Sequence, residues 1–186
     1  VLYRTTTRVC HSKSLVEFAE REEKPIPPFT RDIRARVCTP AFAYENHPIL
    51  EEKLRRLEEY GNTCALNRVE MAGTKVGVIT ASIAYEYARE IFPEDTSFLK
   101  LGLTNPLPMK LIREFAAKVE KLYVIEELEP IMEEQIRAAG IECIGKELTG
   151  NLYEFNPQVL QKRLFGIEPE TVDVGVQAVS RPPALC

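Results

Sequence analysis

Glycine and histidine are scarce in this chain of 186 residues, and their scarcity excludes several kinds of site. Only nine glycines are present, and none forms the Gly-x-Gly-x-x-Gly or Gly-Lys-Ser/Thr pattern that lets a pyrophosphate approach a backbone loop. The two histidines, His11 and His47, stand apart, so neither can be assigned as the base beside a serine or cysteine. Metal binding needs several ligands at matched spacing, which the adjacent Cys10 and His11 do not supply. We therefore expect neither a nucleotide-binding loop nor a metal site in this chain.

Cysteine is sparse and scattered. The cysteines form no Cys-x-x-Cys pair and are odd in number, namely Cys10, Cys38, Cys64, Cys143 and Cys186. A disulfide framework needs denser and even usage, so we expect a reducing compartment, the cytoplasm. No apolar run approaches the roughly 20 residues that span a bilayer, and residues 1–20 lack the apolar stretch of a signal peptide. The sequence therefore predicts no association with a membrane.

Charge of one sign does not cluster along the chain. Lys and Arg number 24 against 28 Asp and Glu, which gives a formal net charge of −4. Nucleic-acid-binding proteins concentrate basic residues into a patch or stripe, and no such stripe is present in the sequence. Charged runs such as Glu51–Glu59 are typical of a solvated helix face. We expect no nucleic-acid partner.

Strand and helix patterns alternate between residues 74 and 165. Short apolar runs typical of buried parallel strands occur at 75–80, 97–103, 122–126 and 141–145. Apolar residues at helical spacing follow these runs at 83–91, 108–119, 130–139 and from Asn156 onward. Ser82 is the expected N-cap of the first of these helices. Because such alternation makes βαβ units with right-handed crossovers, the predicted fold is a three-layer α/β sandwich with a mainly parallel sheet.

Proline and charge patterns divide the chain into four parts, 1–24, 25–47, 48–165 and 166–186. The first part opens with β-branched residues typical of a strand and continues into a short polar helical stretch at Ser14–Glu23. The second part is rich in proline and predicts an ordered or extended linker. The third is the α/β domain, which opens with a helix from about Pro48 to Asn62, and the fourth is a connector. We expect this chain to be an internal piece of a longer protein.

Two pairs of polar residues stand at predicted strand ends, where α/β folds place functional groups. Glu126 and Glu127 follow the third strand of the α/β domain. They either bind a ligand at the carboxyl edge of the sheet, or end the strand and meet solvent or the dipole of the next helix. Arg8 and His11 leave the first predicted strand. They are either functional groups, or a surface cation and a polar side chain with satisfied hydrogen bonds.

Several segments, in the same order, resemble the alpha subunit of indolepyruvate ferredoxin oxidoreductases, members of the 2-oxoacid:ferredoxin oxidoreductases. These segments are Leu2–Ser12, Lys75–Thr80, Tyr85–Glu90, Phe98–Pro108, Val119–Pro130 and Arg181–Cys186. The resemblance assigns residues 1–24 to the end of a pyrimidine-type thiamine diphosphate domain and 48–165 to a domain similar to the transketolase C-terminal domain. It assigns 166–186 to the connector into a second thiamine diphosphate domain.

The resemblance implies an enzyme that decarboxylates an aryl 2-oxo acid such as indolepyruvate on thiamine diphosphate and forms an acyl-CoA. Electrons would pass through [4Fe-4S] clusters to ferredoxin. In that family, the acid that activates the cofactor, the diphosphate and Mg²⁺ site and the cluster cysteines belong to regions outside the segment matched here. No catalytic residue is therefore carried over, and no cofactor is expected on this chain.

The role that the resemblance implies is architectural. We expect the chain to hold the two flanking thiamine diphosphate domains in position, with a smaller beta subunit and ferredoxin as further partners. Arg8 and His11 fall in the part that matches the first domain, which makes them candidates for lying near the substrate. Two alternatives stay open. The chain is a stand-alone α/β module that binds an acyl-CoA or a nucleotide at the sheet edge, or it is a non-catalytic assembly subunit.

Overall fold

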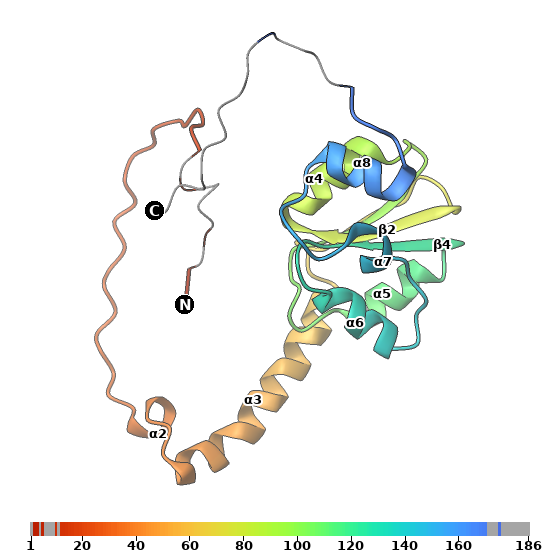
Figure 1. Ribbon diagram of the computed structural model, residues 1–186. Coiled ribbons are helices and arrows are strands. Elements are labelled where there is room, and N and C mark those ends of the chain that lie inside the picture. Colours follow the sequence, from red (N-terminus) through yellow and green to blue (C-terminus); the bar gives the residue numbers. More distant parts are fainter. Residues whose placement is uncertain (1, 4, 6–9, 11, 171–174, 176–186) are drawn as a thin grey trace. The chain divides into compact units, whose positions relative to one another are not determined.

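The computed structural model describes residues 2, 3, 5, 10, 12–170 and 175 (Figure 1). The chain divides into two units, residues 1–33 with 172–186, and residues 34–171. In the first unit, residues 12–32 contain neither helix nor strand, so the helix predicted at Ser14–Glu23 is not formed. The large apolar side chains of this segment are exposed, Phe18 by 99%. A helix that short is marginally stable without a packing partner. The strand predicted at the start of the chain lies largely outside the described residues.

The second unit is built on a four-stranded sheet with the order β1-β3-β2-β4. Its strands are β1 (Arg68–Glu70), β2 (Val76–Ala81), β3 (Ser97–Leu101) and β4 (Lys121–Ile125). Strand β2 pairs in parallel with both β3 and β4, and β1 runs antiparallel to β3. This arrangement confirms a mainly parallel α/β sheet. The strand predicted at 141–145 is reduced to one parallel bridge between Tyr123 and Ile144, and β1 was not predicted.

Helices cover both faces of this sheet and make it a three-layer sandwich. Figure 1 shows α4 (Ser82–Ile91) and α8 (Pro157–Phe165) on one face, with α5 (Met109–Ala116) and α6 (Ile131–Ala138) on the other. A short helix, α7 (Lys146–Thr149), precedes α8. Successive residues of a strand point to opposite faces, so each central strand contributes side chains to two hydrophobic cores. Val78, Phe98 and Tyr123 pack with α4 and α8, whereas Ile79, Leu99 and Val124 pack with α5 and α6.

Local sequence explains where α8 begins but not where α4 begins. The last predicted helix begins at Asn156 as expected, and Asn156 caps α8 by accepting a hydrogen bond from the Val159 N–H at 2.8 Å. Ser82 is not an N-cap. It is the first residue of α4, with a φ of 53°, and no side chain caps that helix. The buried face of α4 carries Tyr85 with the expected alanines, while Ile83 is 41% exposed.

Helix α3 (Pro40–Gly61) is longer than predicted, because it begins before Pro48 rather than at it. Thr39 caps its N-terminus by accepting a hydrogen bond from the Phe42 N–H, and Pro40 takes the first helical turn, where proline lacks no needed donor. Pro48, in the interior of the helix, has no N–H to donate to the Tyr44 carbonyl. Tyr44 is exposed to water. No helix in the described part of the chain is long and apolar enough to cross a membrane.

The two ends of α3 are fastened differently. At its start, Arg34 of the short helix α2 (Ile33–Arg36) pairs with Glu45 at 2.6 Å. At its end, Asn62 accepts a hydrogen bond from the Leu111 N–H, and Asn67 binds the Gly61 carbonyl while accepting from the Gly102 and Leu103 N–H groups. These asparagines attach the helix to the sandwich at α5 and at the end of β3.

Gly77 lies where strand β2 packs closely against α5 and the segment that follows it. A Cβ atom there would lie 2.8 and 2.9 Å from the two Val119 methyl carbons and 3.1 Å from the Phe115 ring. We expect Gly77→Ala to lower the free energy of unfolding by about 1–3 kcal/mol, because the added methyl overpacks a filled core. Urea denaturation checks this, with exposed Lys75→Ala as the control, expected to stay within about 0.5 kcal/mol. Equal unfolding midpoints for Gly77→Ala and the wild type would contradict the packing described here.

Candidate functional site

A crevice between two neighbouring strands, β2 and β4, lies at the carboxyl edge of the sheet. Strand β2 leads into α4 on one face, and its neighbour β4 leads into α6 on the other. In open α/β sheets, ligands bind where adjacent strands diverge in this way. A cavity of about 460 Å³ lies there, lined by Ala81, Ser82, Ile83, Ala84, Thr104, Asn105, Glu126, Glu127, Ile131 and Met132.

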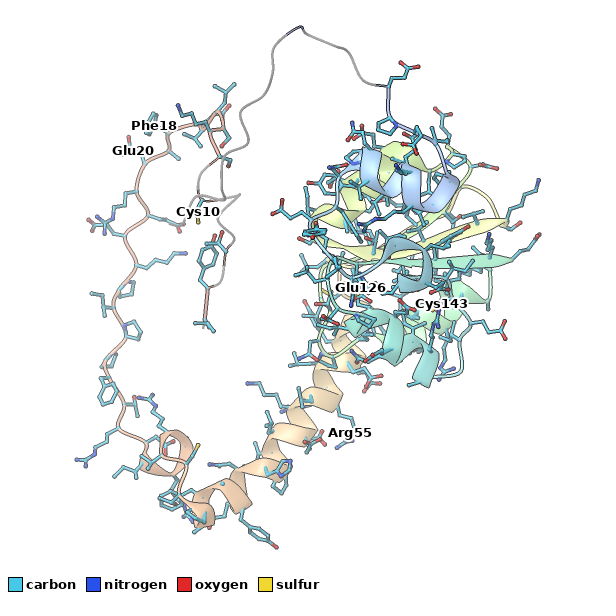
Figure 2. All side chains as sticks on the ribbon, in the orientation of Figure 1. Cys10, Phe18, Glu20, Arg55, Glu126 and Cys143 are labelled. Atoms are coloured by element: carbon cyan, nitrogen blue, oxygen red, sulfur yellow. The ribbon has the colours of Figure 1, made fainter. Side chains whose placement is uncertain are left out.

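Glu126 lies at the base of this crevice and caps α6. Its carboxylate accepts hydrogen bonds from the Met132 N–H at 2.9 Å and from the Glu133 N–H at 2.8 Å. Figure 2 shows Glu126 inside the α/β module, where it is only 8% exposed. Burial raises the pKa of Glu126, and the two backbone N–H groups oppose that shift. The carboxylate therefore meets the dipole of the next helix, one of the two roles considered for it from the sequence.

Lys146 is the cation of this edge, and the sequence analysis missed it. Its ammonium group donates a hydrogen bond to the Glu126 carbonyl and lies 5.1 Å from the centroid of the Phe155 ring. Burial lowers the pKa of Lys146, and the neighbouring carboxylates, Glu126 first among them, oppose that shift. Its position directly after the predicted fourth strand was the one signal available in the sequence.

The other acidic residues of the edge are also bound within the module. Glu127 accepts a hydrogen bond from the Phe155 N–H at 2.8 Å. Glu133, 5% exposed, accepts from the Lys146 N–H and pairs with Arg137, which also pairs with Glu147. These contacts tie α6 to α7. Glu126 and Glu127 thus stabilise the edge, and a ligand-binding role for them stays a prediction.

The second predicted pair, Arg8 and His11, lies outside the described residues. Cys186 does too. Among the described residues, no group of three or more His, Cys, Asp or Glu side chains could hold a metal ion. Neither the carboxyl edge nor any other described part of the chain therefore fits a metal.

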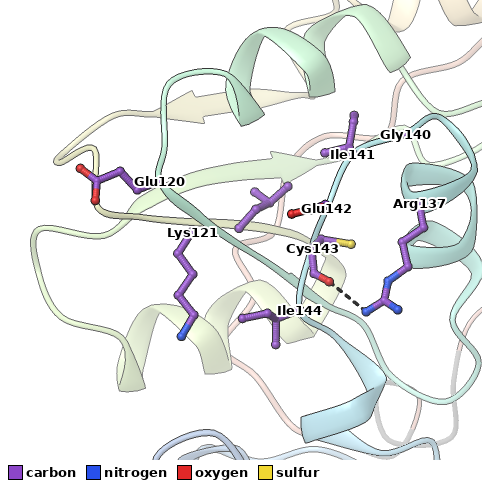
Figure 3. Close-up of a pocket in the computed structure, with 9 residues that line it drawn as sticks. Glu120, Lys121, Arg137, Gly140, Ile141, Glu142, Cys143 and Ile144 are labelled. Carbon is purple, nitrogen blue, oxygen red and sulfur yellow. Dashed lines mark hydrogen bonds between the residues drawn. The ribbon is translucent and has the colours of Figure 1, made fainter.

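A larger cavity, of about 680 Å³, opens beside the outer edge of β4 (Figure 3). It forms because the segment 140–144 pairs with β4 only at Ile144. Arg137 closes one side by donating a hydrogen bond to the Cys143 carbonyl at 2.9 Å. Burial raises the pKa of the Cys143 thiol, against the opposing effect of Arg137. A thiol held protonated is a poor nucleophile, so this cavity offers less chemistry than the carboxyl edge.

Comparison with known proteins gives a consistent set of relatives. The chain is similar to proteins named indolepyruvate oxidoreductase subunit IorA, at 34% identity in Methanothermobacter thermautotrophicus, 33% in Methanothermobacter marburgensis and 30% in Archaeoglobus fulgidus. Each comparison covers 100% of this chain and 33% of the relative, so the chain spans about a third of the length of these curated relatives. No protein-family model matches the chain.

The fold is also found among solved structures. One of them is the 2-oxoglutarate:ferredoxin oxidoreductase from Magnetococcus marinus with 2-oxoglutarate, coenzyme A and succinyl-CoA bound. The TM-score is 0.50 at 20% sequence identity, and the likeness covers 68% of this chain and 23% of that one. At this identity the likeness shows a common fold.

The buried carboxylate of Glu126 predicts a pH dependence of stability. Its pKa is raised above the ordinary 4.5 by burial, so its contribution is present below that pH and is lost as the pH rises through the folded-state pKa. We expect Glu126→Gln, which keeps an acceptor for α6, to flatten the fall in unfolding free energy between about pH 4.5 and neutral pH. Urea denaturation across this range measures it. Exposed Glu129→Gln, on the same loop, should keep the wild-type slope, and identical slopes for all three proteins would contradict the assignment.

Proposed function

Because the chain belongs to the family of indolepyruvate oxidoreductase IorA subunits, we propose that it is the domain-positioning part of a 2-oxoacid:ferredoxin oxidoreductase. The enzyme would decarboxylate indolepyruvate or a related aryl 2-oxo acid oxidatively and form an acyl-CoA. The proposal rests on the alignment of the whole chain with a third of each of those subunits. The bound coenzyme A and succinyl-CoA of the Magnetococcus enzyme support coenzyme A as the acyl acceptor.

The chemistry of the carboxyl edge supports positioning over catalysis. Glu126 and Glu127 accept backbone hydrogen bonds from α6 and from Phe155, and Lys146 donates to a backbone carbonyl. Groups used in this way hold loops in place. In a multidomain active site, a small displacement of one domain lowers the rate even when none of its residues touches the substrate.

The described residues do not fit thiamine diphosphate, its Mg²⁺ or an iron–sulfur cluster. Strand β2 ends at Ala81 and α4 begins at Ser82, so the junction between them lacks the glycines that admit a diphosphate. No metal-holding group is found in the part of the chain that the structure describes. When bound elsewhere in the enzyme, thiamine diphosphate would supply the carbanion chemistry and the clusters would carry the electrons. We therefore assign no step of the reaction to the described residues.

The partners follow from the same proposal. The flanking thiamine diphosphate domains would contact this module, a smaller beta subunit would complete the enzyme, and ferredoxin would accept its electrons in the cytoplasm. The alternative is a module that binds an acyl-CoA or a nucleotide, and the cavity of about 460 Å³ favours it. A rise in melting temperature of the 186-residue chain with coenzyme A would support that alternative.

A positioning role predicts that single polar substitutions at the edge have small effects on catalysis. We expect Glu127→Gln, which keeps an acceptor for the Phe155 N–H, to change kcat by less than about tenfold. Removal of a general acid or base typically costs about 10²–10⁴-fold. The measurement is indolepyruvate-dependent ferredoxin reduction by the full-length gene product with its small subunit, with exposed Glu94→Gln, in the loop before β3, as the control. A hundredfold loss at an unchanged melting temperature would assign Glu127 a catalytic role.

Arg8 and His11 are the residues that we propose to lie near the substrate, since they fall in the part resembling the first thiamine diphosphate domain. A guanidinium group is a natural partner for the carboxylate of a 2-oxo acid. We expect Arg8→Ala to raise the KM for indolepyruvate about tenfold or more, the loss of one charge-assisted hydrogen bond. Steady-state kinetics of the full-length enzyme test this against Lys13→Ala. Unchanged kinetics for Arg8→Ala would remove Arg8 from the site.

A further inference from the structure

Three exposed apolar side chains lie on the elements that form the carboxyl edge, and two of them line its cavity. Ile83 is 41% exposed, Leu128 56% and Ile131 65%, and they come from α4, from the loop after β4 and from α6. Ile83 and Ile131 line the same cavity, and we call the three residues the edge patch. Single exposed apolar residues are ordinary on a protein surface. A group of them around a hollow, bordered by polar residues, marks an interaction site.

Acidic residues flank the edge patch, and the nearby cation, Lys146, already donates a hydrogen bond to the Glu126 carbonyl. Glu127 and Glu129 stand next to Leu128 on the loop after β4, and neither forms an ion pair with a lysine or arginine of the described residues. Glu126, below them, binds α6. A surface that fits this edge would therefore carry an apolar side chain for the cavity and basic residues opposite the two glutamates.

The relatives indicate where such a surface comes from. The whole 186-residue chain covers 33% of each IorA subunit that it matches, so most of each of those proteins lies outside the matched part. A segment of the same polypeptide is held close at a high effective concentration. Its binding does not require a phosphate-binding loop in this module, as the binding of a nucleotide would. An anionic ligand such as coenzyme A is less suited, since Glu127 and Glu129 flank the patch and the ammonium group of Lys146 is already bound to the Glu126 carbonyl.

We propose that the edge patch docks the remainder of the full-length polypeptide, through an apolar side chain that enters the cavity and basic residues that face Glu127 and Glu129. This inference rests on the proposed function, because it identifies the face through which the module is held in the enzyme. It makes Ile83, Leu128 and Ile131 positioning residues, which act by fixing the module and touch neither substrate nor cofactor.

Hydrogen exchange of the full-length gene product tests the docking. The variant is Ile83→Gln/Ile131→Gln, and the matched control is Ile49→Gln on α3, since Ile49 is 64% exposed against 65% for Ile131. We expect amides at 82–85 and 128–133 to exchange at least about tenfold faster in the double variant than in the wild type and the control. Protection in β2 should be unchanged, which shows that the module stays folded. If β2 also loses protection, Leu128→Gln replaces the double variant under the same criterion.

Two results would overturn the inference. One is equal exchange at the edge in the wild type and the variant. The other is protection of the edge that appears only when coenzyme A or indolepyruvate is added, which would make it a ligand site. Activity separates this inference from the proposed function. Ferredoxin reduction without edge protection refutes the docking alone, and edge protection without indolepyruvate-dependent reduction refutes the proposed function alone.

Discussion

The capping of α6 by the Glu126 carboxylate is the interaction on which the carboxyl edge of the sheet depends. The first N–H groups of a helix have no partner within it, and here the residue that follows β4 supplies one across the loop. Lys146 binds the carbonyl of the same residue and thereby brings α7 to the edge. The cost is a carboxylate taken out of water, and the raised pKa of Glu126 is its signature.

This use of charge determines what the module can offer an enzyme. Its edge carboxylates and its half-buried lysine bind backbone groups, so they fix the shape of the edge. The apolar hollow is left as the feature that a neighbour can recognise. A positioning domain needs a rigid edge more than it needs reactive groups. The alignment with IorA subunits and the hydrogen bonds of the carboxyl edge both support the positioning role that we propose.

The sequence allowed the layered fold to be predicted because each central strand and helix carries its own periodicity. Val78 and Ile79 feed opposite cores, and the cap at Asn156 is local. Strand β1 could not be read in this way. It has three residues, and it is held by distant partners, Tyr85 binding Glu70 and Ser97 binding Ala72 and Gly73. The strand predicted at 141–145 was wrong for a related reason. Its residues have an apolar pattern, but only Ile144 pairs with β4.

The candidate site was predictable to the same extent. The position of Glu126 and Glu127 at a strand end followed from the pattern, whereas their partners on α6 and at Phe155 depend on how separate segments meet. Only its place after an apolar run marks Lys146 in the sequence. Its pKa is lowered by burial, which depends on the fold and not on its neighbours in sequence.

Helix α3 sets the distance and the rotation between the sandwich and the α2 end of the helix. Its 22 residues measure about 33 Å at 1.5 Å per residue, and its last turn is clamped by Asn62 and Asn67. One residue more or less would shift its α2 end by about 1.5 Å and also turn it by about 100° around the helix axis. Length and orientation are thus coupled in this segment. Insertions or deletions would preserve the facing of its surface only in whole numbers of turns, near seven or eleven residues.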